Sequence, residues 1–307
     1  MSIKSKNNIL LIMAQDGFLF KGSRAEGYNV CHPYKQCNLL GRIIREFIFR
    51  FFPILSYLFY TEEIFKGDWD KIVIWDPLIT RQFLDKIHKA YPNAQLDFVY
   101  WNMVGKCRHL KPSQIPGYVR KWTYDDYDSK QYGLNLYSTY PYYKAFIREH
   151  IDNKIDVLFV GKDKGRGEYL LELERKLQDL GLKTKFIITK SDRLAKNKNY
   201  YQNEISYSQI CDYISHSRSV LNVVMENQEG LTLRDLEYVY QGVKLLTTNQ
   251  MIVNNPIYNP SNVFVIKDMN LIGIKEFLFK ERVSLPIEVM EHHTFDSFIK
   301  EITSAHE

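Results

Sequence analysis

The chain of 307 residues is long enough for two α/β domains of ordinary size, each with a core of its own. Hydrophobic residues make up 45% and charged residues 25%, a balance that excludes a disordered chain. The net charge of +5 mildly favours phosphorylated or anionic partners. No recognisable nucleic-acid module is present, so nucleic acid is not expected as a partner.

The cysteines and the N-terminus indicate a cytoplasmic location. None of the four cysteines belongs to a CxxC pair, and no histidine is placed to complete a zinc site. Free thiols in a reducing cytosol are the simplest interpretation. The first residues are charged and an apolar run follows, but a small-residue cleavage site is missing, so we predict no signal peptide.

Strands and helices alternate through the first half of the chain. Strands are predicted at residues 8–13, 71–75 and 95–101, a helix at 79–90, and a loop at 15–22. This order is typical of a parallel α/β sheet with right-handed crossovers. Residues 105–140 contain short strand-like pieces and a helical turn whose order stays open.

Residues 38–60 are strongly apolar, but Arg42, Arg45, Glu46 and Arg50 interrupt the run. A membrane-spanning helix needs about 20 predominantly apolar residues, so these charges argue against a span. Pro53 should end or kink any helix here. Two interpretations have equal weight: a basic, aromatic helix at a membrane surface, or a partly buried helix of the N-terminal domain.

A second α/β series begins near residue 154. Strands are predicted at 156–160, 185–189, 220–225, 244–248 and 263–267, and helices at 168–181, 208–215, 232–241, 271–279 and 295–305. The helix at 168–181 is the most regular, with Leu170, Leu173, Leu177 and Leu180 at helical spacing. We therefore expect Rossmann-like domains at residues 1–150 and 151–307, with the last helix a candidate for crossing back to the first domain.

Residues 225–249 carry the strongest functional signal. A strand ends in a polar loop and a helix begins at Thr232, which has the capping-box spacing to Asp235. Gly242 is expected to close the helix before the next strand. Such a helix directs unpaired N–H groups and its positive dipole end at the loop, which makes an anion site.

This segment resembles the donor site of retaining GT-B glycosyltransferases. In that family a glutamate, a glycine and an apolar residue are followed by a second glutamate eight positions after the first. The present chain has Glu229-Gly230-Leu231 and then Glu237, in the same strand–loop–helix–strand context. The resemblance implies that Glu229 contacts the donor sugar and favours the charge that develops at the anomeric carbon. It also implies that Glu237 accepts hydrogen bonds from ribose hydroxyls.

The same resemblance places the diphosphate of the donor beside Gly230, Leu231 and Thr232, held by backbone N–H groups near Leu231 and Thr232. The alternative is a structural one. Glu229 would then be a solvated loop residue, and Glu237 would pair with Arg234 three positions before it.

A glycine-rich turn, GKDKGRG at residues 161–167, follows the first strand of the second domain. Its glycine spacing is not the dinucleotide-binding fingerprint. Related glycosyltransferases carry a basic pair here, so Lys162, Lys164 and Arg166 are candidates for bonding the leaving pyrophosphate. A solvated basic turn is the alternative. Tyr207 lies where such enzymes bind the nucleobase, although ordinary packing is the favoured interpretation.

The first domain would hold the acceptor. It resembles bacterial lipopolysaccharide and capsule glycosyltransferase-like proteins loosely, through WDPLITRQFL, FVYWN and WTYDDYD. Asp16 follows the first strand, a cleft-facing place in doubly wound folds, and is a candidate catalytic residue. Asp125, Asp126 and Asp128 are candidate acid/base groups or acceptor ligands, although a solvated turn is the favoured interpretation.

The resemblance implies an α/β enzyme of GT-B architecture, with two Rossmann-like domains facing across a cleft. It would move a sugar, with retention, from a nucleotide-sugar donor to a glycan or lipid-linked acceptor in bacterial surface polysaccharide synthesis. Contact with the inner face of the membrane would suit such an acceptor. No metal or other cofactor is expected, because a helix dipole and basic side chains stabilise the leaving group.

Two alternatives stay open. One is an inverting GT-B transferase whose catalytic base comes from the first domain, with Asp16 as the candidate. The other is a GT-B-like protein that binds nucleotides or glycans without turnover.

Overall fold

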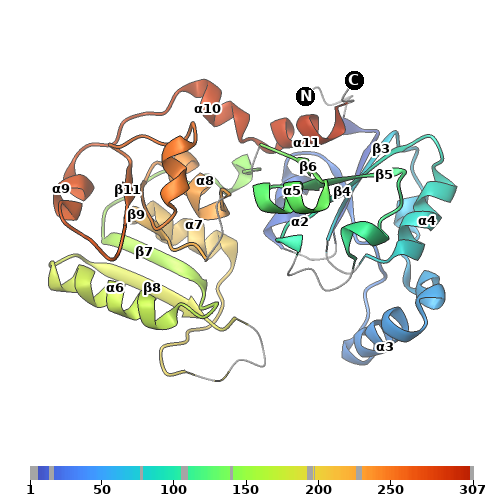
Figure 1. The fold of residues 1–307 in the computed structure, drawn as a ribbon, viewed down its shortest axis with the longest axis horizontal. Coiled ribbons are helices and arrows are strands. Elements are labelled where there is room, and N and C mark those ends of the chain that lie inside the picture. The colour runs from blue at the N-terminus through green and yellow to red at the C-terminus, as the bar shows by residue number, and fades with distance from the viewer. Residues whose placement is uncertain are drawn as a thin grey trace. The chain divides into compact units, whose positions relative to one another are not determined.

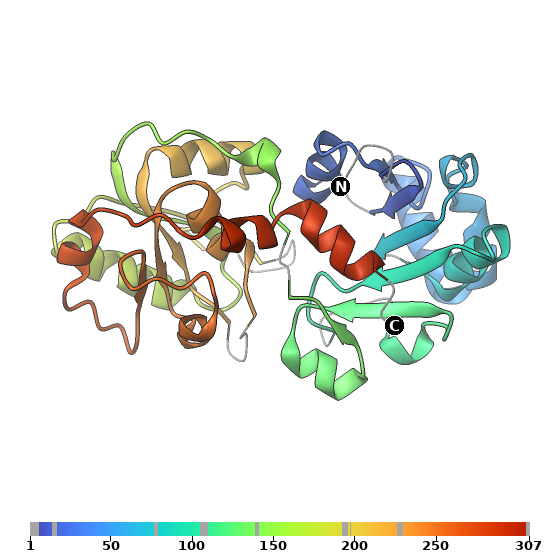
Figure 2. The same ribbon diagram turned by 90° about the horizontal axis from the view of Figure 1, so that it is seen from above.

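The computed structural model describes residues 6–13, 17–76, 79–104, 110–138, 141–191, 196, 198–225 and 230–304. The chain divides into two compact units. Unit 1 comprises Met1–Ala145 and Thr294–Glu307, and unit 2 comprises Phe146–His293. Each unit is an α/β structure built on one parallel sheet (Figures 1 and 2). The fold class is therefore α/β, as predicted.

The sheet of unit 1 has the strand order β2-β1-β3-β4-β5-β6, with every neighbouring pair parallel. Its strands are β1 (Ile9–Ile12), β2 (Asn29–Cys31), β3 (Lys71–Trp75), β4 (Gln95–Val99), β5 (Val119–Thr123) and β6 (Asn135–Leu136). The strand β1 is buried along its whole length, as expected for a parallel strand covered on both faces. The order changes direction between β1 and β3, which makes this the switch point of the sheet.

The helices of unit 1 are α2 (Phe18–Ala25), α3 (Leu39–Phe51), α4 (Arg81–Ala90), α5 (Asp126–Tyr132) and α11 (Phe295–Thr303). The predicted loop at 15–22 is wrong for its described part, because α2 begins at Phe18. Phe20 and Ser23 are buried on this helix. Gly22 reads as a loop residue in the sequence, but its small size is required because the buried ring of Tyr143 lies against it.

The prediction that Pro53 ends the apolar helix is confirmed. The helix α3 ends at Phe51, and Pro53 begins the 3₁₀ turn η1 (Pro53–Phe59). Asn38 caps the other end, where its side chain accepts a hydrogen bond of 2.9 Å from the N–H of Gly41.

The last helix, α11, is fixed to the sheet of unit 1 at its C-terminal end. Arg120 on β5 donates to the buried carboxylate of Asp97 at 2.7 and 3.1 Å, and also to the carbonyl of Ser304 at 2.9 Å. Lys71 on β3 donates to the carbonyl of Thr303 at 2.8 Å. Basic side chains thereby satisfy carbonyls that a helix end leaves unpaired.

The sheet of unit 2 has the strand order β11-β10-β9-β7-β8, again with parallel neighbours. Its strands are β7 (Ile155–Lys162), β8 (Thr184–Thr189), β9 (Ser217–Asn222), β10 (Lys244–Thr247) and β11 (Val263–Val265). Its helices are α6 (Gly167–Asp179), α7 (Tyr207–Ser215), α8 (Leu233–Tyr240), α9 (Ile274–Phe279) and α10 (Ile287–His292). The order changes direction between β7 and β9.

Successive residues of β7 face opposite sides of this sheet. Val157 and Phe159 pack in one cluster with α6 and α9, whereas Leu158 and Val160 pack in another with α7 and α8. On α6 the predicted core positions Leu170, Leu173 and Leu177 are fully buried. The prediction that Leu180 is a further core position of this helix is wrong, because Leu180 lies beyond the end of α6 and is 38% exposed.

Within the described residues, the helices are all too short or too polar to cross a membrane.

Candidate functional site

The candidate site of unit 2 lies at the switch point between β7 and β9. The loop after β7 carries the basic turn of residues 163–166, and the described part of the loop after β9 leads into α8 (Figure 1). Ligands of open α/β sheets bind outside the carboxyl ends of the strands at such a point. The topology therefore brings the two functional segments of the sequence to one edge of the sheet.

Arg234 joins these two segments. Its Nη2 donates to the carbonyl oxygen of Val160 on β7 at 2.8 Å, and its Nη1 pairs with Oε2 of Glu237. The ion pair that the sequence offered as the structural alternative is thus present. This pair involves Oε2 of Glu237 and does not involve the other carboxylate oxygen, Oε1.

Glu237 is completely buried, and its second oxygen, Oε1, has no hydrogen-bond partner. Burial raises the pKa of this carboxyl group, while the charge of Arg234 and the nearby hydroxyl of Tyr207 oppose the rise. A buried acceptor without a donor costs about 1–3 kcal/mol. Such an atom marks a place where a ligand hydroxyl or N–H would be stabilising.

Tyr207 approaches Glu237 from the first turn of α7. Its hydroxyl group lowers the pKa of the Glu237 carboxyl group, and its ring packs edge-on against Phe146 with ring centres 4.9 Å apart. The side chain is half-buried. Tyr207 therefore belongs to this cluster through its hydroxyl group, and its contact with a nucleobase stays a prediction.

Arg166 is the residue of the basic turn whose charge interacts with that of Arg234. Burial lowers the pKa of Arg166 to about 10, Asp163 opposes this, and Arg234 lowers it further. The guanidinium is still protonated at neutral pH. Its Nε is buried without a hydrogen-bond partner, while Nη2 donates to the carbonyl of Lys162 at 3.3 Å. Two neighbouring, partly buried guanidinium groups favour an anionic ligand.

The two lysines of the turn are placed differently. Lys162 pairs with Glu204 at 3.3 Å, and because both side chains are well exposed this pair stabilises little. Lys164 is exposed, has a φ of +49°, and its backbone N–H donates to Ser191 Oγ at 2.7 Å. Their proposed contacts with a pyrophosphate stay predictions.

Asp163 holds the turn in shape, and sequence reasoning missed it. This buried carboxylate accepts hydrogen bonds from the N–H of Gly167 at 2.7 Å, from Tyr200 at 3.0 Å and from Tyr201 at 2.5 Å. The sequence pattern that could have identified Asp163 is an aspartate four residues before the start of a helix, because a carboxylate there can accept hydrogen bonds from N–H groups of the first turn.

Thr232 and Asp235 form the predicted capping box of α8, but its hydrogen bonds do not fit the role that the resemblance gave to Thr232. Its N–H and hydroxyl both bond to Oδ2 of the buried Asp235, at 2.7 and 3.0 Å, and Asn222 donates to Oδ1 of Asp235 at 2.8 Å. The protein's own carboxylate therefore takes the N–H that the resemblance gave to the diphosphate. Leu231 is half-buried against the core of unit 2, and the roles of Gly230 and Leu231 stay predictions.

The two predicted catalytic residues, Glu229 and Asp16, lie outside the described residues. Among the residues that are described, no three His, Cys, Asp or Glu side chains gather as they would to hold a metal ion.

The acidic cluster of unit 1 is structural and not a solvated turn. Asp125 caps α5 by accepting from the N–H of Asp128 at 3.0 Å, and Asp128 accepts from the N–H of Val104 at 2.7 Å. Both side chains are buried, and burial raises the pKa of Asp128. The expectation of a solvated turn is therefore wrong for these two residues, whereas Asp126 is exposed.

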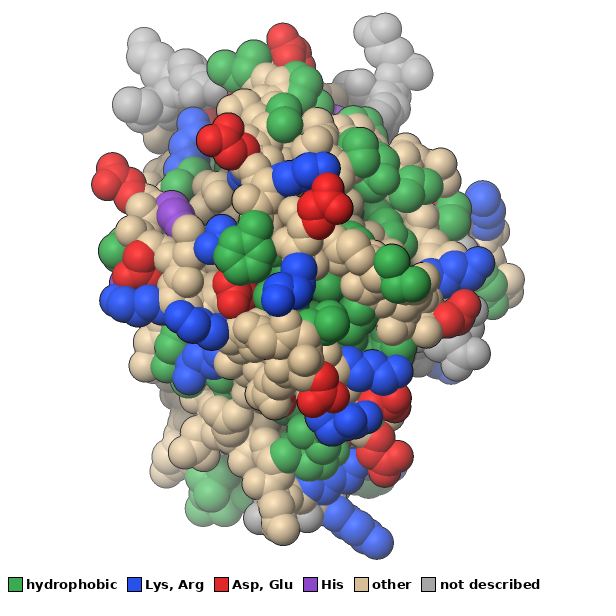
Figure 3. Space-filling view, turned by 90° about the vertical axis from the view of Figure 1, so that its left-hand side faces the viewer, with side chains coloured by type: hydrophobic (Ala, Val, Ile, Leu, Met, Phe, Trp, Pro, Cys, Tyr) green, Lys and Arg blue, Asp and Glu red, His purple; other side chains and the backbone are tan. Residues whose placement is uncertain are grey.

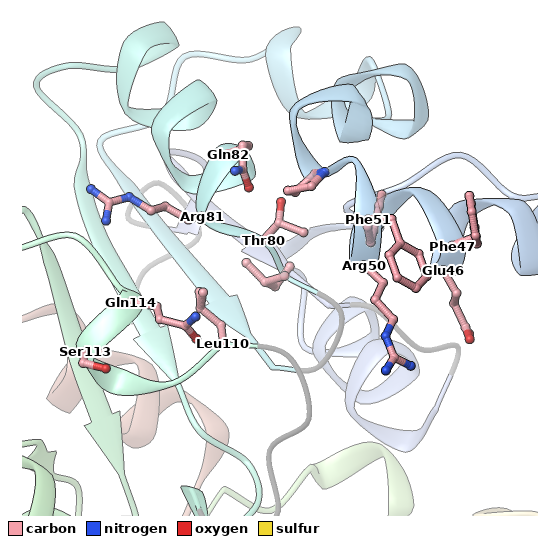
Figure 4. Close-up of a pocket in the computed structure, with 13 residues that line it drawn as sticks. Glu46, Phe47, Arg50, Phe51, Thr80, Arg81, Gln82, Leu110, Ser113 and Gln114 are labelled. Atoms are coloured by element: carbon pink, nitrogen blue, oxygen red, sulfur yellow. The ribbon is translucent and has the colours of Figure 1, made fainter.

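Unit 1 contains a groove of about 1100 Å³ that the sequence did not reveal. It lies beyond the carboxyl ends of β3 and β4, between α3 and the first turn of α4 (Figure 4). Its lining combines apolar and polar side chains: Glu46, Phe47, Phe49, Arg50, Phe51, Pro53, Ile79, Thr80, Arg81, Gln82, Leu110, Ser113 and Gln114. A groove of this size and mixed chemistry suits an amphiphilic ligand.

No protein-family model matches the chain, and no curated protein matches its sequence. Among solved structures, the chain is similar to sucrose-phosphate synthase from Thermosynechococcus elongatus, with a TM-score of 0.54 and 11% identity, over 88% of each chain. An NADPH-dependent glyoxylate/hydroxypyruvate reductase from Sinorhizobium meliloti aligns over 91% of this chain and 82% of its own at 9% identity, but its TM-score of 0.23 carries no argument. The fold is therefore the two-unit, parallel-sheet α/β fold of GT-B glycosyltransferases.

Proposed function

We propose that the chain is a glycosyltransferase that binds a nucleotide-sugar donor in unit 2, at the carboxyl ends of β7 and β9. One observation carries the proposal. The site contains a buried donor without an acceptor, Nε of Arg166, and a buried acceptor without a donor, Oε1 of Glu237. Phosphate oxygens only accept hydrogen bonds, whereas ribose hydroxyls can donate them, so a nucleoside diphosphate offers both missing partners.

The charges of the site fit the same ligand. With a pKa of about 10, Arg166 carries its charge at neutral pH, and one oxygen of Glu237 pairs with the neighbouring Arg234. A departing nucleoside diphosphate develops negative charge, which positioned guanidinium groups stabilise. In this proposal Arg166 contacts the pyrophosphate, while Arg234 fixes the Glu237 carboxylate so that its Oε1 accepts from ribose.

The finer parts of the proposal rest on the sequence resemblance. We propose retention of the anomeric configuration, with Glu229 beside the donor sugar, and a glycan or lipid-linked acceptor of bacterial surface polysaccharide synthesis in unit 1. The mixed apolar and polar groove between α3 and α4 supports an amphiphilic acceptor. The anomeric configuration of the product, read by NMR, tests retention: an inverted product would favour a base from unit 1 such as Asp16.

The donor site is tested by a thermal-shift panel of UDP, GDP, ADP, CMP and their common sugar conjugates. A ligand specific for the folded state stabilises it by about 2.7 kcal/mol at a hundredfold excess over Kd. We expect one nucleotide to raise Tm clearly. Arg166→Gln should abolish that shift, whereas Arg175→Gln, which alters an exposed arginine on α6, should keep it.

The outcomes separate the alternatives. Binding with slow release of nucleoside diphosphate from the sugar conjugate supports a transferase that awaits its acceptor. Binding without any release, even when glycan and lipid acceptors are supplied, supports the non-catalytic alternative. If no nucleotide or conjugate raises Tm, the proposed donor site is wrong.

A further inference from the structure

Exposed apolar side chains are concentrated in one segment of unit 1. The described part of the chain exposes 24 large hydrophobic side chains, and 11 of them fall within residues 39–58. They are Leu39, Leu40, Ile43, Ile44, Phe47, Phe51, Phe52, Ile54, Leu55, Tyr57 and Leu58. We call this segment, formed by α3 and most of η1, the α3–η1 surface. Large exposed apolar patches of this kind mark interaction sites.

The helix α3 is attached to unit 1 by one side only. None of its residues is buried. Phe49 is its apolar side chain that packs against the core of unit 1, where its ring lies 4.8 Å from that of Tyr34. Leu40, Ile44, Phe47 and Phe51 recur at three- and four-residue intervals and are all exposed. They form a continuous apolar stripe that nothing in the described chain covers.

A basic side chain lies beside this stripe: Arg50 is exposed, and its guanidinium lies 5.5 Å from the ring centre of Phe51. Arg42 is also exposed, but it is two positions from Leu40 and Ile44 and therefore lies on the other side of the helix. Arg45 is turned toward the ring of Tyr34, also at 5.5 Å. Glu46 is the one acidic residue between positions 39 and 58, so the segment carries a net charge of +2. On the end of unit 2 drawn in Figure 3, by contrast, basic and acidic side chains alternate.

We propose that the α3–η1 surface docks on an anionic lipid bilayer, with α3 lying in the interfacial plane. Apolar side chains on one face and arginines beside them are the features of interfacial helices. The helix has 13 residues, whereas a span needs about 20, so it would lie on the bilayer and not cross it. Arg50, beside the stripe, would contact lipid phosphates of opposite charge.

Charge distinguishes this partner from a second copy of the chain. A twofold interface would place the same patch of two molecules face to face, so two segments that each carry a net charge of +2 would oppose each other. A lipid surface with anionic head groups supplies the opposite charge and an apolar interior together. The proposal therefore fits both the sign of the charge and the apolar stripe.

The docking surface shares residues with the groove of unit 1. Phe47, Arg50 and Phe51 line the groove and also belong to the α3–η1 surface (Figure 4). A bilayer in contact with α3 would lie at the rim of the groove. A lipid-linked molecule could then reach the groove without leaving the membrane. Docking itself does not depend on the proposed transferase activity.

Flotation of the whole chain with lipid vesicles tests the inference. The vesicles contain phosphatidylcholine alone or mixed with phosphatidylglycerol. The apolar variant combines Phe47→Ser with Phe51→Ser, and the charge variant combines Arg42→Gln with Arg50→Gln. The matched controls in unit 2 are Ile272→Ser with Ile287→Ser, which remove exposed apolar side chains, and Arg175→Gln. Thermal melts of each variant check that the fold is retained.

We expect the chain to float with the anionic vesicles, and high salt to weaken the binding. Each double variant should reduce binding about tenfold or more, and the controls should leave it unchanged. Failure to float with anionic vesicles would overturn the proposal, as would equal binding by the variants. A dimer that the apolar variant dissociates, without vesicle binding, would assign the surface to a second copy. Nucleotide binding is measured separately in unit 2, so either proposal can fail alone.

Discussion

Arg234 and Glu237 form an ion pair across one turn of α8, and the same arginine holds the carbonyl of Val160 on β7 at 2.8 Å. The arginine side chain is 14% exposed and the glutamate is fully buried. The pair therefore fixes the helix to the strand beside it and, at the same time, presents the free Oε1 of Glu237. A substitution at Glu237 affects both roles, and two variants are needed to separate them.

Removal of the carboxylate should cost stability. Glu237→Ala leaves the largely buried Arg234 without its partner, and breaking a buried pair in this way costs about 3–5 kcal/mol. Glu237→Gln keeps an oxygen and most of the volume, so we expect a smaller loss. Urea unfolding measures both values. Glu172→Gln, in an exposed pair with Lys176 on α6, is the control and should change stability by less than about 0.5 kcal/mol.

Nucleotide affinity of the folded Glu237→Gln variant tests the ribose contact itself. A glutamine cannot offer two acceptor oxygens, so either Arg234 or the ribose loses its partner. We expect calorimetry to show at least a tenfold higher Kd, about 1.4 kcal/mol. Unchanged affinity in a folded variant would falsify the ribose role of Glu237 and leave the pair with its structural role.

Asp97 and Arg120 should be the most sensitive pair of unit 1. Asp97 is completely buried and accepts from Arg120, from Trp122 at 2.8 Å and from Gln95 at 2.7 Å. Asp97→Asn replaces one acceptor oxygen with a donor that faces these N–H groups. We expect a loss of about 3–5 kcal/mol by urea unfolding. Asp179→Asn, at an exposed carboxylate, is the matched control.

Hydrogen exchange locates that effect. Arg120 also holds the carbonyl of Ser304, so the last turn of α11 should exchange faster in Asp97→Asn than in the parent chain. Uniform acceleration over both units would instead indicate global unfolding and contradict the local role.

Local signals made the alternation of strands and helices predictable. The capping box of Thr232 and Asp235 and the end of α3 before Pro53 depend on residues a few positions apart, and both are found in the structure. The same applies to the core positions of α6, where the apolar period follows one helix face.

Long-range contacts account for what the sequence did not predict. The helix α2 needs a glycine at position 22 because the ring of Tyr143, 121 positions away in the chain, leaves no room for a Cβ. The proximity of Arg166 to Arg234 depends on β7 lying next to β9, which residue spacing does not reveal. Asp128 is buried because it satisfies the N–H of Val104, again a contact between distant positions.

Substitution of Gly22 should show how tightly α2 is packed. A Cβ at this position would lie 2.5 Å from Cγ of Tyr143, whose ring is fully buried and whose hydroxyl is hydrogen-bonded to Ser23. The ring cannot move away freely, so we expect Gly22→Ala to cost about 1–3 kcal/mol in thermal or urea unfolding. Gly117→Ala, where no atom lies within 4 Å of the added carbon, should be close to neutral. Equal stabilities of the two variants would contradict the close packing.

Asp163 should make the stability of unit 2 depend on acidic pH. Burial raises the pKa of this carboxyl group, but hydrogen bonds from Tyr201, Tyr200 and the N–H of Gly167 outweigh it and hold the pKa below its ordinary value of 3.8. The folded state therefore binds the proton less readily than the unfolded chain. The stabilisation is complete above the ordinary value and is lost as pH falls through the lower, folded pKa.

The variant Asp163→Asn tests this origin of the acid sensitivity. We expect it to be less stable than the parent chain at neutral pH, and the difference to shrink as the pH falls below the ordinary value of 3.8 and the parent loses the contribution of the carboxylate. Urea unfolding across this range measures the difference, with Asp126→Asn on the exposed side of α5 as the control. A difference that stays constant with pH would show that the hydrogen bonds of Asp163 do not depend on its charge. The turn that carries Arg166 would then be held by hydrogen bonds that do not need a charged carboxylate. In that case protonation of Asp163 should not change nucleotide affinity either.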